Sequence, residues 1–344
     1  MSAYSLLRPL IFRLDAERAH RLTVRALASR NGKAAPRQDS ILASRVAGLD
    51  FPNPVGLAAG FDKDAACPDG ILGLGFGFAE VGTLTPRPQV GNPQPRLFRL
   101  VEDRAVINRM GFNNGGQAAA LGRLSARRGR GGIVGVNIGA NKDSEDRIAD
   151  YVAGVRAMEP VADYLTVNIS SPNTPGLRAL QSRESLDELL ARVVEARTGT
   201  TPIFLKVAPD LEPADIEDIA AVVTARGIDA IIVANTTIGR PALKSRHATE
   251  TGGLSGAPLR DLALQRLRDF RAATHGAVPL IAAGGIDSAD AAWARIRAGA
   301  SLVQLYSALV YEGPGLAQRI AAGLAERLRA AGYGGLAEAV GTDA

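Results

Sequence analysis

Eight short apolar runs recur along this sequence, and nearly every one is followed by a stretch with helical periodicity. The runs are rich in Val, Ile, Leu and Ala and cover residues 55–59, 78–82, 132–138, 163–169, 202–208, 229–234, 278–283 and 301–306. Strands that are apolar on both faces and alternate with helices are typical of a parallel sheet. Eight such units predict an α/β fold of the (β/α)₈ TIM barrel type in preference to a doubly wound sheet.

The barrel pattern does not account for the whole chain. Residues 84–131 are too long for one helix, so we expect an insertion between the second and third strands. The first 30 residues predict two short helices, because apolar residues recur there at helical spacing. Asn31-Gly32 and the following alanines and proline mark a linker. The predicted division is a helical subdomain at 1–35, a barrel at 45–335 and a C-terminal tail at 336–344.

Positive charge is concentrated in the N-terminal segment. Residues 1–33 carry seven Lys or Arg against Asp15 and Glu17, which equals the net charge of +5 of the whole chain. The remainder is neutral overall, which argues against nucleic-acid binding. A basic amphipathic helical pair is typical of a segment that lies on an anionic membrane surface; the alternative is a hairpin packed on the barrel. The sequence predicts neither a signal peptide nor a transmembrane span.

Several kinds of catalytic site are excluded by the residues available. Cys67 is the only cysteine, so no internal disulfide is possible, and the three histidines are widely separated with no metal-ligand spacing. Asp62 is the only carboxylate at a predicted strand end, which disfavours the paired carboxylates of glycosidases. We therefore expect no metal site and no hydrolytic machinery.

Polar residues cluster at the carboxyl ends of the predicted strands, where TIM barrels carry their active sites. They interrupt an otherwise apolar pattern at Lys63, Thr83, Asn137, Asn168, Lys206, Asn235, Thr236 and Ser307. A single Asn in such a place is an ordinary turn former. The whole set indicates a site rich in amide groups.

The last two strand ends have the features of a phosphate site. Gly284-Gly285 precedes a helix expected to begin at Asp287, and Tyr306-Ser307 follows the eighth strand. Backbone N–H groups and a helix N-terminus hold anions at these places in TIM barrels. Together with Lys206 they fit flavin mononucleotide (FMN), because a buried cation stabilises the negative charge of reduced flavin. The alternative for Lys206 is an ion pair at the barrel rim.

The stretch 165–176 begins as a strand and then breaks into hydroxyls, amides and two prolines. Pro172 and Pro175 fix φ and stiffen the loop. A stiff polar loop after a barrel strand indicates a small-molecule site, although Asn, Ser and Pro also make ordinary turns. Over the face of a flavin, one hydroxyl of this loop would accept a proton from the substrate.

These motifs, in this order, resemble those of the class 2, quinone-dependent dihydroorotate dehydrogenases. The resemblance spans essentially the whole chain, including Glu17-Arg-Ala-His20 in the N-terminal helices. The other matching segments are Asn53–Lys63, Glu80–Gln89, Asn108–Asn113, Val136–Gly139 with Asn141-Lys142, Val167–Thr174, Asn235–Thr237, Gly252–Gly256, Gly284–Ser288 and Gln304–Ser307.

The resemblance implies one FMN per chain and a set of contacts for each ligand. The implied flavin contacts are Ala59, Gly60, Phe61, Asp62, Lys63, Thr83, Asn137, Asn168, Lys206, Ala234, Gly256, Gly285, Tyr306 and Ser307. The implied dihydroorotate contacts are Lys63, Asn108, Arg109, Met110, Gly111, Phe112, Asn168, Asn173, Asn235 and Thr236. Relatives often carry a hydroxyl residue where this chain has Ala234, so a contact there would be through the backbone.

The same resemblance implies a mechanism and a subclass. Ser171 would be the catalytic base, taking a proton from the substrate ring as hydride leaves for flavin N5. Class 1 relatives are cytosolic, use cysteine as the base and lack the N-terminal helices. A serine hydroxyl is a poor base at neutral pH, so this mechanism requires a desolvated site and a proton relay to solvent.

The N-terminal helices acquire a role from the resemblance. They would frame an apolar tunnel through which a membrane quinone reoxidises the flavin, with His20 and Arg99 at its head group. A lone histidine on a helix is otherwise a surface or packing residue. The implied product is orotate, in pyrimidine biosynthesis, and the implied protein is a monomer held peripherally on the cytoplasmic face of the cell (inner) membrane.

Two other functions fit part of the pattern. One is a related FMN barrel that acts on another dihydropyrimidine-type ring, against which stand Ser171 and the basic helices. The other is a non-catalytic phosphate-binding barrel or scaffold, which would give no reason for Lys206 to share the strand ends with so many asparagines.

Overall fold

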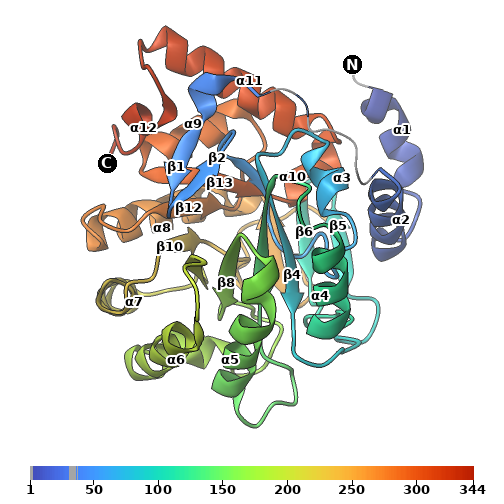
Figure 1. Cartoon of the computed structure of the whole chain (residues 1–344). Helices are drawn as coiled ribbons and strands as arrows, with labels where there is room; N and C mark the ends of the chain where they lie inside the picture. Colours follow the sequence, from blue (N-terminus) through green and yellow to red (C-terminus); the bar gives the residue numbers. More distant parts are fainter. Residues whose placement is uncertain (1–2, 31–35, 37) are drawn as a thin grey trace.

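The computed structural model describes residues 3–30, 36 and 38–344, and its centre is a closed barrel of eight parallel strands (Figure 1). Each strand lies within two residues of a predicted one, so the predicted TIM barrel is confirmed. In barrel order the strands are β3 (Val55–Leu57), β4 (Phe78–Leu84), β7 (Ile133–Ile138), β8 (Tyr164–Asn168), β9 (Ile203–Val207), β10 (Ala230–Val233), β12 (Leu280–Ala283) and β13 (Ala300–Leu305).

Helices surround the barrel and bury apolar stripes against it. In α6, for example, Leu186, Leu189, Leu190 and Val193 are all fully buried, as their helical spacing predicts. The helices after the strands are α3 (Pro68–Leu72), α4 (Gln117–Ala126), α5 (Arg147–Met158), α6 (Arg183–Ala196), α7 (Pro213–Arg226), α8 (Arg260–Ala273), α9 (Ala289–Arg297), α10 (Ser307–Glu312) and α11 (Leu316–Ala330). Short elements complete the chain at η1 (Ser40–Leu42), η2 (Glu159–Val161), η3 (Leu177–Gln181), η4 (Ala257–Leu259) and α12 (Leu336–Ala339).

The amino-terminal end of the barrel is closed by aromatic side chains and a hairpin. Strands β1 (Ser44–Val46) and β2 (Leu49–Phe51) pair antiparallel. Phe51 packs edge-on against Phe78 with ring centroids 5.1 Å apart, and Tyr164 stacks on Phe204 at 4.4 Å. This plug leaves the opposite end of the barrel for the site.

Two insertions meet over the carboxyl end of the barrel. The segment 84–131 contributes β5 (Leu97–Leu100) and β6 (Ala105–Asn108), and β11 (Gly253–Gly256) comes from the connection after β10. They form one antiparallel sheet in the order β5-β6-β11, with Gly253 opposite Asn108. The expected insertion is confirmed, and its pairing with β11 was not predicted.

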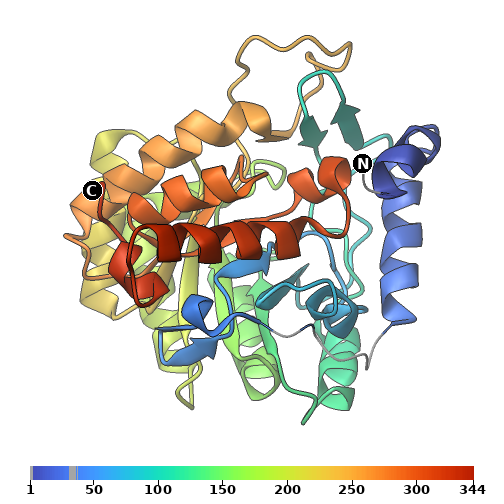
Figure 2. The same ribbon diagram turned by 90° about the horizontal axis from the view of Figure 1, so that it is seen from above.

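The two predicted N-terminal helices are also confirmed, as α1 (Ala3–Ile11) and α2 (Ala16–Ala28). They lie together on one side of the barrel, next to β5 and α3 (Figure 2). Glu17 of α2 forms a buried ion pair with Arg96 at 2.8 Å, and the Tyr4 hydroxyl donates to the Val310 carbonyl at 2.6 Å. No helix in the described ranges is long and apolar enough to cross a membrane.

The boundaries of the predicted subdomains remain predictions. Most of the expected linker, at 31–35, lies outside the described residues. In the predicted tail at 336–344, Leu336 and Ala339 of α12 are buried, and Asp343 pairs with Arg297 of α9. Cys67 is the residue that immediately precedes α3, and Ser288 caps α9, one residue beyond the expected helix start at Asp287.

Candidate active site

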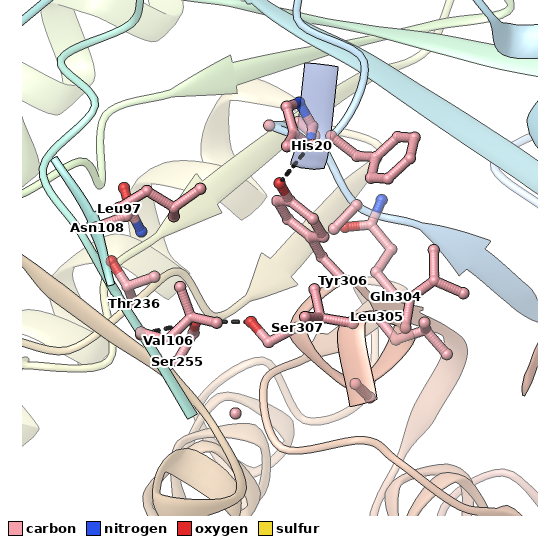
Figure 3. Close-up of a pocket in the computed structure, with 18 of the residues that line it drawn as sticks. His20, Leu97, Val106, Asn108, Thr236, Ser255, Gln304, Leu305, Tyr306 and Ser307 are labelled. Carbon is pink, nitrogen blue, oxygen red and sulfur yellow. Dashed lines mark hydrogen bonds between the residues drawn. The ribbon is translucent and has the colours of Figure 1, made fainter. Parts of the chain in front are cut away.

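A cavity of about 490 Å³ opens at the carboxyl ends of the barrel strands and extends to α1 and α2. Its walls come from the strand ends, the β5-β6-β11 sheet and the N-terminal helices. Figure 3 shows His20 of α2 on one side of this space, Val106, Asn108 and Ser255 of the sheet on another, and Tyr306 between them.

Most of the predicted site residues line this one cavity. From the predicted flavin set these are Ala59, Gly60, Phe61, Lys63, Thr83, Asn168, Lys206, Ala234, Gly256, Gly285, Tyr306 and Ser307. From the predicted substrate, base and quinone sets they are Asn108, Met110, Gly111, Phe112, Ser171, Asn173, Asn235, Thr236, His20 and Arg99. These residues come from distant parts of the chain, from His20 to Ser307, and only the fold brings them together.

Three predicted residues are not among those that line the cavity: Asp62, Asn137 and Arg109. The Asp62 carboxylate accepts the backbone N–H groups of Ala66 and Cys67, both at 2.8 Å, and so shapes the loop after β3. The Arg109 guanidinium pairs with Glu250 at 2.7 Å and lies over the Phe98 ring. The side chains of Asp62 and Arg109 therefore stabilise the walls of the site, and a ligand contact by either residue stays a prediction.

Asn137 supports the site from beneath. Its Oδ1 accepts the Thr83 hydroxyl at 2.5 Å and the Asn168 amide at 3.1 Å, while its own amide donates to Glu80 at 2.8 Å. Asn168 also donates to Thr83 at 3.0 Å. This closed set of hydrogen bonds fixes the amide orientations of both asparagines.

Glu80 is a buried carboxylate in the middle of β4, 1% exposed. Besides Asn137, it accepts hydrogen bonds from Tyr164 at 3.1 Å, Thr166 at 3.2 Å and Gln304 at 2.8 Å. Four donors from three other strands offset the free-energy cost of burying the charge. Glu80 therefore anchors the polar layer under the cavity.

Lys206 is the cation that faces this layer. It lies near the end of β9, is 5% exposed and lines the cavity. Burial lowers the pKa of its ammonium, and the charge of Glu80 raises it. No carboxylate of the described chain lies within 4.0 Å of it, so the alternative of an ion pair at the barrel rim is not observed. A buried ammonium without such a partner is suited to an anionic ligand.

The loop after β8 carries Ser171 into the cavity. Ser171 is 6% exposed, and its hydroxyl accepts the backbone N–H of Asn173 at 3.3 Å. Its neighbour Ser170 bonds the Asn168 side chain at 2.8 Å and accepts the Asn235 amide at 2.8 Å. The loop is thus tied to the strand that precedes it and to the end of β10.

Arg178 holds that loop from behind. Its guanidinium donates to the Ser170 carbonyl at 3.0 Å, to the Thr236 carbonyl at 3.0 Å and to Asp210 at 2.8 Å. Asp210 in turn accepts the Thr237 hydroxyl. Arg178 and Asp210 therefore clamp the loops after β8 and β10 in one arrangement.

The opposite end of the cavity is built from glycines and hydroxyls. Gly285 has φ +68°, and a Cβ there would lie 2.4 Å from the Arg260 Cα, so only glycine fits. Ser255 and Ser307 share a hydrogen bond of 2.7 Å (Figure 3). These residues have the small side chains that allow backbone N–H groups to approach an anion, as an anion-binding loop requires.

Lys63 lies at the boundary between barrel and helices. Its ammonium donates to the Gly60 carbonyl. Burial lowers the pKa of Lys63 to about 8, while the charges of Glu17 and Asp64 act in the opposite direction. Lys63 is therefore mostly protonated at pH 7 and begins to lose its charge at mildly alkaline pH.

His20 joins α2 to the barrel. Its Nδ1 lies 3.3 Å from the Tyr306 hydroxyl, and its ring packs edge-on against Phe61 (Figure 3). Burial, and then the charge of Lys63, lowers the pKa of His20 to about 3, so the imidazole is neutral at physiological pH. Arg99 lies over the Phe12 ring and donates to the carbonyls of the turn between α1 and α2.

Sequence reasoning missed three functional side chains. Glu80 and Ser255 occur inside matched motifs, and a glutamate in the middle of an apolar strand is itself a signal of a buried polar network. Arg178 gave no signal, because its three acceptors come from three different segments.

Known proteins similar to this chain are dihydroorotate dehydrogenases. A family model described as dihydroorotate dehydrogenase matches residues 41–328. The dihydroorotate dehydrogenase (quinone) of Novosphingobium aromaticivorans is 65% identical over the full length of both chains. That of Erythrobacter litoralis is 62% identical over 99% of each chain. The crystal structure of DHODH from Eimeria tenella in complex with ferulenol has a TM-score of 0.91 at 41% identity and covers 96% of each chain.

Proposed function

The chain belongs to the dihydroorotate dehydrogenase family, in its quinone-dependent class, and we propose that it oxidises (S)-dihydroorotate to orotate with bound FMN and a membrane quinone as electron acceptor. This reaction is a step of pyrimidine biosynthesis. The observation that carries the detailed proposal is that Ser171, Lys63 and Lys206 line one cavity together with the predicted amide residues.

The residues present fit FMN. The cavity volume of about 490 Å³ is within the usual range for cofactor sites. Lys206 offers an unpaired buried cation at one end, and the glycine loops at Gly256 and Gly285 offer an anion site at the other. The chemistry that bound FMN would supply is two-electron transfer, as acceptor of the hydride equivalent of the substrate and donor of electrons to the quinone.

Ser171 is the proposed base. Its Oγ takes one proton from a ring carbon of dihydroorotate as its own hydroxyl proton passes to solvent, and the adjacent ring carbon gives up a hydride equivalent to the cofactor, so the substrate loses two hydrogens and gains one double bond. Because Ser171 is buried, the substrate excludes water from its hydroxyl, which favours direct proton transfer.

The proposed substrate contacts surround that hydroxyl. Lys63 provides a positive charge for the carboxylate of dihydroorotate, and Asn108, Asn173 and Asn235 provide amide donors and acceptors for its ring. Asn173 already donates to Asn108 at 3.4 Å, and Asn235 to Ser170 at 2.8 Å. The side chains are thus pre-oriented, which lowers the entropy lost on binding.

The quinone would reach the flavin between α2 and the barrel, beside His20 and Arg99. Five of the exposed large apolar side chains belong to α1, α2 or their connection: Leu6, Leu7, Leu10, Leu14 and Leu22. Exposed leucines on a basic helical pair support peripheral binding to an anionic membrane. We propose the cytoplasmic face of the cell (inner) membrane as the location and a monomer as the working form.

Anaerobic titration tests this function. The purified protein is expected to be yellow, with one FMN per chain, and dihydroorotate is expected to bleach the flavin absorbance; a ubiquinone analogue should restore it. A colourless protein would refute the proposal. Bleaching by dihydrouracil but not by dihydroorotate would instead support the alternative of a related flavin barrel.

A further inference from the structure

Arg295 of α9 is a buried cation that the proposed mechanism does not use. The residue is 1% exposed, and its Nη2 donates to the backbone carbonyls of Arg260 at 2.5 Å and Gly284 at 3.2 Å. Its Nε has no hydrogen-bond partner. Within residues 3–30, 36 and 38–344, no carboxylate lies within 4.0 Å of this guanidinium.

The charge of Arg295 is poorly compensated by the protein. Burial lowers the pKa of Arg295 to about 10, and the charges of Arg260 and Arg268 lower it as well, opposed by Asp261. The guanidinium is still protonated at pH 7. An unpaired buried charge is unfavourable, so its retention calls for a further negative partner.

Arg295 sits directly behind the glycine loop of the cavity. Gly284 and Gly285 line that cavity, and the Gly284 carbonyl is directed to Arg295. In a trans peptide the carbonyl and the following N–H point in opposite directions, so the Gly285 N–H points away from Arg295. That N–H has no hydrogen-bond partner in the described part of the chain.

Other charges near the loop are already matched. Asp287 also lines the cavity, but its carboxylate accepts Arg260 at 2.7 Å. Arg104 is shared between Glu312 and, at 3.9 Å, Asp287. Arg295 is thus the cation whose charge remains uncompensated next to the glycine loop.

We propose that Arg295 is a positioning residue for the phosphate of the cofactor. Its hydrogen bond keeps the Gly284 carbonyl directed to Arg295, so that the Gly285 N–H stays available to a phosphomonoester. Its positive charge, on the other side of the glycine loop, offsets the negative charge of the phosphate dianion. This inference rests on the proposed binding of FMN, and it assigns to Arg295 the part of the affinity that depends on the phosphate group.

Riboflavin, which has the same ring system and no phosphate, separates this role from a structural one. Apoprotein would be titrated with FMN and with riboflavin by fluorescence quenching. For Arg295→Met we expect the dissociation constant of FMN to rise on the order of tenfold or more, a change similar in size to the loss of one charge-assisted hydrogen bond. The dissociation constant of riboflavin should stay unchanged. Arg295→Lys should recover part of the FMN affinity.

Arg297 on the same helix is the matched control. Its guanidinium pairs with Asp343 at the surface, so Arg297→Met removes an equal charge away from the loop and should leave both constants unchanged. Equal loss of FMN and riboflavin affinity in Arg295→Met would overturn the proposal. Wild-type affinity of this variant for both flavins would overturn it as well. If the methionine variant does not fold, Arg295→Gln, which keeps an amide donor without the charge, decides by the same ratio. Failure of wild-type apoprotein to bind either flavin would overturn the proposed function itself.

Discussion

At the scale of single residues, Ser171 has an unusual environment for a base. Its hydroxyl accepts a hydrogen bond from the Asn173 N–H, and no histidine or carboxylate of the described chain bonds this hydroxyl. It differs in this respect from a serine nucleophile activated by an adjacent histidine. The hydroxyl must therefore act through its position over the substrate and through burial, and its own proton must leave by a relay to solvent.

Replacement of Ser171 by alanine is expected to slow anaerobic flavin reduction by about 10²- to 10⁴-fold, the usual contribution of a general base. FMN should remain bound at wild-type stoichiometry, because the hydrogen bond of the Ser171 side chain is to the Asn173 N–H of its own loop and involves no predicted flavin contact. Stopped-flow absorbance with dihydroorotate measures the rate. Ser245→Ala is the matched control, since Ser245 is a serine as buried as Ser171 and does not line the cavity. Equal slowing in both variants would contradict the assignment.

Lys63 gives a pH dependence whose sign follows from its pKa of about 8. The orotate anion binds best when Lys63 is protonated, so affinity should be constant below that pKa and fall as pH rises above it. Well above it, the dissociation constant should rise about tenfold per pH unit. Calorimetric titration of the oxidised enzyme with orotate between pH 6.5 and 9.5 measures this.

The Lys63→Met variant provides the comparison for the pH profile. It should bind orotate weakly at all pH values and show no fall between pH 7.5 and 9. His20 contributes no step in this range, since its pKa is about 3. An unchanged profile in Lys63→Met would assign the titration to another group, such as Lys206.

The residues of the site differ in how far sequence could predict them. Polar strand ends stand out from an apolar background, so Asn168, Lys206 and Asn235 could be found from position alone. Asp62 also follows a strand, but its carboxylate is taken by backbone N–H groups of its own loop. The role of Glu80 depends on donors from three other strands, two of which are not adjacent to β4, and that arrangement exists only once the barrel has closed.

At the scale of elements, local sequence patterns predicted the strands of the barrel but not the long-range pairing of β11 with β6. Each barrel strand is a continuous apolar run with a helix after it, so the sequence itself marks it. Strand β11 pairs with β6 across about 150 residues of chain, and its sequence Gly-Leu-Ser-Gly has no strand signature. Only the proximity of two insertions over the barrel makes it a strand.

The Arg178–Asp210 clamp holds the loops after β8 and β10, which carry the proposed substrate contacts. Arg178→Met removes three hydrogen bonds, which reach Ser170 after β8, Asp210 after β9 and Thr236 after β10. We expect the KM for dihydroorotate to rise about tenfold, since loosened loops lose pre-orientation, while FMN stays bound. Steady-state kinetics and the flavin-to-protein absorbance ratio measure the two effects.

Arg183→Met is a suitable control for the clamp. Arg183 begins α6, and its exposed side chain pairs with Asp218 at the surface. An exposed pair contributes little to stability, so this variant should keep the wild-type KM. A wild-type KM in Arg178→Met would show that the loops are held by Ser170 and Asn235 without the clamp.

At the scale of the whole molecule, the cavity connects two surfaces with different chemistry. One end is lined by the proposed substrate-binding amides under the β5-β6-β11 sheet, and the other lies beside α1 and α2, whose outer faces expose leucines. A polar substrate and an apolar quinone could thus approach the flavin from different sides. The buried Glu17–Arg96 ion pair keeps the helices in place on the barrel.

This arrangement predicts that membrane binding and flavin reduction can be separated. The triple variant Leu6→Ser, Leu7→Ser, Leu10→Ser should lower the partition onto anionic phosphatidylglycerol vesicles about tenfold or more, because it removes three apolar side chains from the surface proposed to contact the membrane. Turnover with a long-chain quinone in vesicles should fall in parallel. Anaerobic reduction by dihydroorotate should keep its wild-type rate, since these side chains do not line the cavity.

Ile238→Ser, which alters an exposed apolar residue after β10, is the control and should change neither vesicle binding nor turnover. Vesicle binding that survives the triple substitution but disappears in high salt would show that the basic residues alone hold the protein to the membrane.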